Sequence, residues 1–139
     1  MARENAGDRV YRIGSRTNSG EMMQEAQLKP MLRAMTESGE SWNDPSEDAL
    51  FMFLEDVERG EEKFLIVERL ADSTGQTYIQ SARNDDGSYV VEYRDGGADQ
   101  HFSTSVADVR AAHALITSWA FAEPHWRDSF EWSRISFDS

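Results

Sequence analysis

Four segments in the middle of the chain alternate apolar and polar residues with a period of two. They are residues 63–70, 76–83, 88–94 and 100–105. This period is typical of β-strands that bury one face. The connectors between the segments are short and rich in Asp, Asn, Ser and Gly, so they cannot hold helical crossovers. The pattern therefore predicts an antiparallel meander, with residues 131–137 as a fifth strand.

Helical periodicity precedes the meander. Leu28, Met31, Leu32 and Met35 follow i, i+3, i+4, i+7 spacing within residues 21–38. This spacing predicts an amphipathic helix, and its methionines fit either a core or an adaptable binding face.

Two further helices are marked by start signals. In residues 44–47 Asp44 is expected to cap a helix, with Pro45 at its first position and an acidic residue three positions after the cap. That helix should stop at Gly60. Residues 105–108 offer a similar signal with Ser105 as the cap, for a helix that ends near Pro124.

Together these elements predict an α+β fold, in which an antiparallel meander sheet of four to five strands carries two to three helices packed on one face. The length of 139 residues favours one domain. Residues 1–20 are polar and contain Gly and Ser, so we expect a mobile N-terminal tail, with residues 21–139 as the single α+β domain. The chain shows neither a secretory signal nor an apolar run of membrane-spanning length, and we expect a cytoplasmic protein.

The charge of the chain narrows its partners. It carries 26 acidic and 14 basic residues, a net charge of -12. Ten of the acidic residues and a single basic residue, Arg59, lie between Glu37 and Glu62, so this segment carries -9. Such a field repels phosphate backbones and anionic membranes and attracts basic proteins. We therefore expect a basic protein partner, no direct nucleic-acid contact and no membrane contact, although the charge also fits solubility alone.

Residue patterns typical of catalysis or metal binding are missing. The chain has no Cys, and its three His residues lie too far apart in sequence for a helical or hairpin ligand pair. Asp85-Asp86-Gly87 fits a hairpin turn, because a calcium loop around it would have Ala82 at its first ligand position. We expect no enzyme, no cofactor and no metal.

Glu68 and Glu92 are the carboxylates that the strand pattern draws furthest inward. Facing Arg69 or Arg94 across neighbouring strands, they are expected to form cross-strand ion pairs. No second element of an acid–base mechanism accompanies them.

The order of these elements resembles a known family. The meander (residues 64–102), the late amphipathic helix (106–122) and the final strand with Trp132 resemble the small α+β immunity proteins of bacterial polymorphic toxin systems, a family first associated with deaminase and nuclease toxins. The likeness covers about residues 46–137. It implies stoichiometric inhibition of a cognate toxin, without cofactor or turnover. Toxins that act on nucleic acids need basic grooves, which an acidic protein can occlude.

We expect the partner to bind an acidic patch that contains a few aromatic anchors. The candidate residues are Glu55, Asp56, Glu58, Glu61, Glu62, Asp85, Asp86, Trp42 and Trp126.

Two other classes of function remain open. A small-ligand-binding domain would need a pocket between sheet and helices, lined by Tyr78, Tyr89, Tyr93 and Glu92. An acidic regulatory or chaperone-like protein would present a methionine-rich groove or phosphate-like charge spacing instead.

Overall fold

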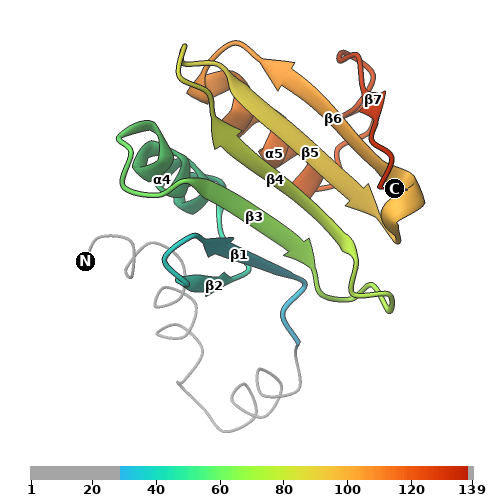
Figure 1. Ribbon diagram of the computed structural model, residues 1–139. Coiled ribbons are helices and arrows are strands. Elements are labelled where there is room, and N and C mark those ends of the chain that lie inside the picture. Colours follow the sequence, from blue (N-terminus) through green and yellow to red (C-terminus); the bar gives the residue numbers. More distant parts are fainter. Residues whose placement is uncertain (1–28, 138–139) are drawn as a thin grey trace, which may run out of the picture.

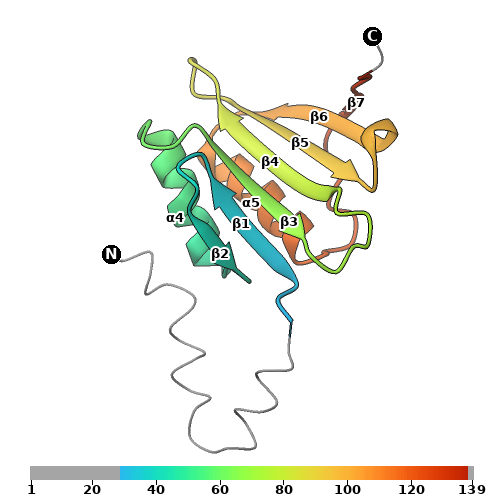
Figure 2. The ribbon, with the colours of Figure 1, turned by 60° about the horizontal axis from the view of Figure 1, so that its bottom comes forward.

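The computed structural model describes residues 29–137, which form a seven-stranded antiparallel sheet with two helices on one face (Figure 1 and Figure 2). The elements are β1 (Leu32–Thr36), β2 (Ser41–Asn43), α4 (Glu47–Glu58), β3 (Phe64–Arg69), β4 (Thr77–Arg83), β5 (Tyr89–Asp95), the short 3-10 helix η1 (Ala98–Gln100), β6 (His101–Val106), α5 (Val109–Ala120) and β7 (Ser133–Arg134). The strand order is β2-β1-β3-β4-β5-β6-β7. The predicted α+β class is confirmed, but the predicted four to five strands are too few.

The predicted meander is confirmed as strands β3 to β6, each of which pairs with the next. Side chains alternate as expected: Tyr89, Val91 and Tyr93 are buried under the helices, whereas Val90 and Glu92 are half-buried on the opposite face. The fifth strand is much shorter than residues 131–137. Only two residues of β7 pair with β6.

The helix predicted over residues 21–38 is wrong where the structure describes it. Residues 32–36 form β1, which pairs with β2 on one side and β3 on the other. Leu32 and Met35 fit a helical spacing, but Leu32, Ala34 and Thr36 also follow a period of two, and all three are buried. Pairing with the free edge of β3 selects the strand. Residues 1–28, which include the predicted tail and the start of that helix, lie outside the described residues.

The predicted helix caps are also displaced. Helix α4 is capped by Ser46, whose hydroxyl accepts a hydrogen bond from the backbone N–H of Ala49. Asp44 lies outside the helix, and its carboxylate accepts hydrogen bonds from the backbone N–H groups of Met31 and Leu32 at 2.9 and 3.0 Å. Short polar side chains cap strands and turns as well as helices, so the pattern alone left the choice ambiguous.

Helix α5 begins one turn later than predicted. Its cap is Asp108, which accepts from the backbone N–H of Ala111, in place of Ser105. The stop at Gly60 is confirmed: α4 ends at Glu58, and Gly60 adopts the left-handed φ of 80° that glycine tolerates best.

The core lies between the helices and the covered face of the sheet. Both helices contribute apolar stripes that pack on inward side chains of the central strands. The largest fully buried apolar side chains are Tyr89, Phe53, Leu50, Leu54, Leu65, Ile79, Leu115 and Ile116. Beyond the end of α5, the loop to β7 completes the cover with Trp126, Phe130 and Trp132. No helix within residues 29–137 is long and apolar enough to cross a membrane.

Ser46→Ala is expected to lower the free energy of unfolding by about 1 kcal/mol, because α4 loses its capping hydrogen bond. Chemical denaturation of both proteins measures the loss. Ser41→Ala, at an exposed position of β2, serves as the control and should stay within about 0.5 kcal/mol of the wild type. Equal losses in the two variants would contradict the assignment of Ser46 as the cap.

Candidate functional site

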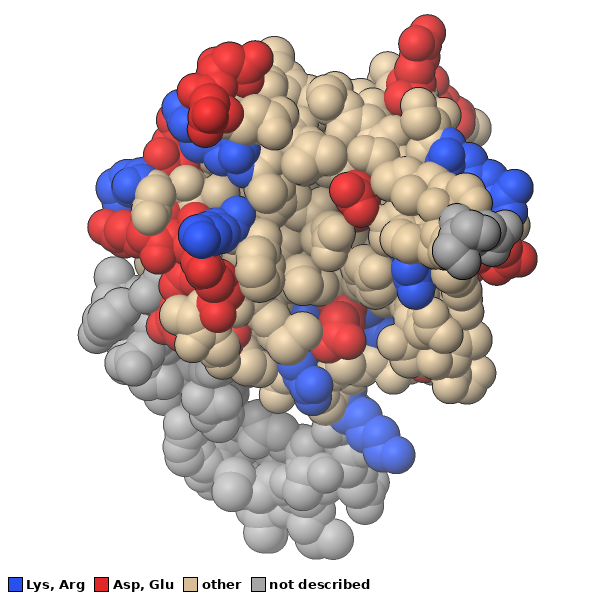
Figure 3. All heavy atoms as spheres, in the orientation of Figure 1, with Lys and Arg blue, Asp and Glu red and all other residues tan. Residues whose placement is uncertain are grey.

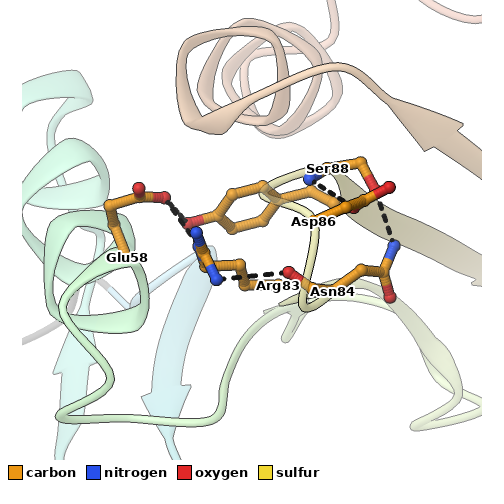
Figure 4. Close-up of polar contacts among 6 residues, drawn as sticks. Glu58, Arg83, Asn84, Asp86 and Ser88 are labelled. Atoms are coloured by element: carbon orange, nitrogen blue, oxygen red, sulfur yellow. Dashed lines mark hydrogen bonds and ion pairs between the residues drawn. The ribbon is translucent and has the colours of Figure 1, made fainter.

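The end of α4 and the β4–β5 hairpin lie side by side because one carboxylate joins them. Glu58, in the last turn of α4, accepts a hydrogen bond from the hydroxyl of Tyr89 at 2.8 Å. The same oxygen accepts from Nε of Arg83 at 3.2 Å. Figure 4 shows Glu58 and Arg83 pointing toward each other from helix and strand. Two acidic segments that are distant in sequence therefore form one surface.

We name this surface the acidic corner. It comprises the exposed and half-buried carboxylates at the end of α4, in the following loop and at the hairpin tip, namely Glu55, Glu58, Glu61, Asp85 and Asp86. Figure 3 shows its acidic side chains gathered along one edge of the molecule, with several basic ones among them. All five residues are candidates from the sequence, and the fold brings them together.

The hairpin tip is held by its own hydrogen bonds. Asp86 accepts from the backbone N–H of Ser88 at 3.0 Å and from its hydroxyl at 2.6 Å, and Asn84 donates to the same hydroxyl (Figure 4). The hydrogen bond from the Ser88 side chain, followed by that from its backbone, lowers the pKa of Asp86. Asp86 thus carries a fixed negative charge at the tip, and its neighbour Asp85 is exposed.

Two of the predicted partner contacts are buried in the fold instead. Glu62 is 8% exposed and accepts hydrogen bonds from the backbone and hydroxyl groups of Ser38 at 3.0 and 2.7 Å. Asp56 is 5% exposed and pairs with Arg59 one turn further along. Glu62 is thus tied to the turn after β1 and Asp56 to the C-cap of α4, so these carboxylates are not available to a partner. The sequence shows that residues 37–62 are strongly acidic, but it does not show which of these carboxylates are buried.

Basic side chains also reduce the charge of the region. Arg83 pairs with Glu58, Arg59 pairs with Glu61 at 3.5 Å, and Lys63 lies 3.9 Å from Glu37. The carboxylates around the corner are Glu37, Glu55, Asp56, Glu58, Glu61, Glu62, Asp85 and Asp86, and against these three cations they leave a net charge of -5. The region stays acidic, but less so than the -9 of residues 37–62.

Of the two tryptophans predicted as surface anchors, Trp42 is buried in the core and Trp126 is half-buried. Trp42 is 6% exposed and packs edge-on against Phe53 at 5.7 Å, so it belongs to the core. Trp126 is half-buried against Tyr93 and Trp132, beyond the far end of α5. Neither lies with the acidic corner. Hydrophobicity alone cannot distinguish an exposed aromatic anchor from a core residue.

The structure also corrects the predicted partners of Glu68 and Glu92. Glu68 lies 4.0 Å from Arg33 on β1, and Glu92 pairs with His101 at 2.8 Å. The predicted partners were Arg69 and Arg94, and they did not include His101. Its register opposite Arg94 and its diagonal position to Glu92 are signals that strand alignment could have supplied.

His101 is held on both sides of its ring. Nε of Arg94 donates to Nδ1 at 3.0 Å, so the neutral ring carries its proton on Nε2 and donates it to Glu92. His101 is only 2% exposed and packs edge-on against Phe137 at 4.9 Å. Both nitrogens are engaged and shielded, which suits a role in positioning Glu92.

The pocket predicted between sheet and helices does not form. Its four residues lie on opposite faces of the sheet: Tyr89 and Tyr93 are buried beneath the helix layer, whereas Tyr78 and Glu92 lie on the other face. The alternation of the strands separates them. Within residues 29–137, no three His, Asp or Glu side chains are placed to hold a metal ion.

Tyr89 and Tyr93 provide a matched test of the link to the acidic corner. Tyr89→Phe is expected to lower the free energy of unfolding by about 1–2 kcal/mol, because Glu58 loses a hydrogen bond. Tyr93→Phe should have little effect or stabilise the protein, since the buried Tyr93 hydroxyl has no hydrogen-bond partner within the described residues. Chemical denaturation at neutral pH compares the two, and a larger loss for Tyr93→Phe would contradict this picture.

The same tyrosine predicts alkaline sensitivity. Burial, and then the hydrogen bond to Glu58, raise the pKa of Tyr89 above its ordinary value. The unfolded chain releases this proton near pH 10, while the folded protein retains it, so the stabilising contribution is complete below that pH and is lost as the pH rises further. We expect the unfolding free energy to fall above about pH 10. Tyr89→Phe should reduce the fall, whereas Tyr78→Phe, on the opposite face, should leave the contribution of Tyr89 intact.

Searches of protein-family models, curated proteins and solved structures found no match. The likeness to immunity proteins therefore depends on the order of elements and aromatic positions alone. Within residues 29–137, the acidic corner and the sheet face away from the helices are the features that bear on function.

Proposed function

We propose that this chain is a non-catalytic acidic binding protein, in the manner of an immunity protein, that blocks a basic partner by occluding its active groove. The observation that carries the proposal is the acidic corner. Glu55 on α4, Glu61 in the loop that follows it and Asp85 in the β4–β5 turn are half-buried or exposed. Within residues 29–137, the one ion pair among these three is that of Glu61 with the exposed Arg59.

Electrostatics supports a basic protein as the partner. The chain has a net charge of -12, and the region around the corner retains -5 after local ion pairs are counted. Complementary potentials accelerate encounter and fix orientation more than they add affinity. A nuclease or deaminase toxin that acts on nucleic acid binds its substrate in a positively charged groove. An acidic surface is complementary to such a groove. Occlusion needs tight binding only, so no turnover is required.

The hydrogen bonds of His101 argue against this histidine as a general base. A general base must reach the proton that it removes, with a free lone pair near the substrate. The lone pair of His101 accepts from Arg94, and its proton is donated to Glu92. This pair therefore supplies a positioned carboxylate and leaves no imidazole nitrogen for proton transfer.

Charge reversal at Glu55, Glu61 and Asp85, each to Lys, is expected to slow association with the partner by about tenfold or more at low salt and to flatten its salt dependence. These positions are chosen because Glu58, Asp56 and Glu62 hold the fold and would confuse the result. A pull-down from the source cells with the full chain, followed by binding kinetics at two salt concentrations, makes the measurement.

The matched control reverses Asp95, Asp99 and Glu131, three exposed acids outside the corner, so that both variants have the same net charge. The control should associate nearly as fast as the wild type. An acidic partner, or equal slowing in both variants, would overturn the proposal that the corner steers a basic protein.

A further inference from the structure

The face of the sheet away from the helices, which we name the open face, carries apolar side chains that stay only half-buried within residues 29–137. Strand register places them in rows across the sheet. One row is Phe64, Ala82, Val90 and Ser105, and the next is Met35, Ile66, Gln80, Glu92 and Ser103. Strands β1, β3, β4 and β5 thus contribute neighbouring apolar side chains to one strip, in which Gln80 and Glu92 are the polar members. In Figure 3 this area is largely uncharged, while charged side chains gather around it.

A hollow of about 280 Å³ lies in this strip. Its lining includes Phe64, Ile66, Gln80, Ala82, Val90 and Glu92. Its volume is close to the lower end of the usual range of small-molecule pockets, about 300–1,000 Å³. The hollow is of a size to receive side chains of another protein.

Glu92 is the charged residue of the hollow, and its orientation is fixed. His101 and Gln80 both donate to Oε1, at 2.8 and 3.2 Å, and within the described residues Oε2 receives no hydrogen bond. The side chain is 26% exposed. A carboxylate among apolar side chains, with one oxygen anchored and the other open, is arranged to accept a hydrogen bond from a cation.

A second hollow beside the acidic corner adjoins the first at one residue. It is lined by Glu58, Arg59, Lys63 and Arg83 among others, and it shares Ala82 with the first. One segment of a partner could therefore cross from charged corner to apolar strip. Two copies of this chain would instead bring net charges of -12 together, and such self-repulsion disfavours a homodimer through this face.

We propose that the open face binds one segment of the basic partner, with its apolar side chains on Phe64, Ile66 and Val90 and a Lys or Arg paired with Glu92. This inference rests on the proposed function and identifies the surface on which that partner is held. The acidic corner then guides encounter, while the strip and Glu92 form the buried centre where binding energy concentrates.

The absence of Cys from the chain allows a direct test. Ala82→Cys places a single thiol in the hollow, and Ala114→Cys places one on the exposed side of α5, behind the sheet. The probe is a short amphipathic peptide of Leu and Lys, with Leu/Glu and Ser/Lys peptides as comparisons. The Leu/Lys peptide should slow labelling of Ala82→Cys by about tenfold at saturation and leave Ala114→Cys unchanged. Equal protection of both sites, no protection, or equal protection by either comparison peptide overturns the proposal.

Glu92→Gln tests the cation pair. Glutamine retains an oxygen that can accept from His101, so the fold should persist, and its unfolding curve checks this. We expect the affinity for the Leu/Lys peptide to fall about tenfold, the effect of losing a partly buried ion pair. Glu68→Gln, on the same face but in the neighbouring polar row beside Arg33, is the control and should leave the affinity within about twofold. An unchanged affinity in Glu92→Gln overturns the assigned pairing.

Other occupants give different results. If the open face is covered without a partner, Ala82→Cys in the isolated full chain will label slowly, and the proposal fails. Slow labelling that depends on protein concentration would indicate a second copy of the chain. Slow labelling that does not would indicate a segment of the same chain. Experiments with the captured partner also distinguish the open-face proposal from the proposed function of the acidic corner. A salt-dependent basic partner that leaves Ala82→Cys accessible overturns the open-face assignment alone. Protection of Ala82→Cys by a partner that ignores the charge reversals overturns the steering role of the corner.

Discussion

Alternation of side chains along the antiparallel strands divides this protein into two unlike faces. On one face the inward residues of β3, β4 and β5 meet the apolar stripes of α4 and α5, and burial of this surface drives folding. On the other, the same strands present Phe64, Ile66 and Val90, which the described residues leave half-buried. A two-layer α+β protein tolerates one uncovered face when it is polar. This one carries an apolar strip beside its polar rows, and that strip is informative about function.

Carboxylates in this chain have two distinct roles that composition cannot separate. Glu58 connects a helix to a hairpin, and Glu62 is buried against the turn that follows β1. Glu61 and Asp85 are exposed in the same region, and the ion partner of Glu61, Arg59, is itself exposed. The negative field at the surface is therefore produced by fewer groups than the sequence contains, and those groups are positioned by the others. The surface carboxylates Glu61 and Asp85 therefore depend for their position on Glu58 and Glu62, which hold the fold.

Hydrogen bonding gives Glu92 a different character from the acids of the corner. His101 is buried, its proton is directed by Arg94, and it fixes one oxygen of the carboxylate on the open face. An exposed charge is screened by water and salt, whereas a charge set among apolar side chains interacts more strongly with a partner that excludes water. The two kinds of acid suit two stages of association, encounter and retention.

Local patterns were sufficient to predict the four meander strands to within a residue or two, because a period of two and short polar connectors act over neighbouring residues only. They failed at residues 32–36, whose spacing fits both helix and strand, because the free edge of β3 made the choice. Net charge and the acidic run were equally plain in the sequence. Whether Trp42 is an anchor or core, whether Glu62 is free or buried, and which residues share a face with Glu92 depended on segments that meet only in the folded chain. Burial and hydrogen bonding arise from contacts between segments that are distant in sequence, so only the tertiary structure decides them.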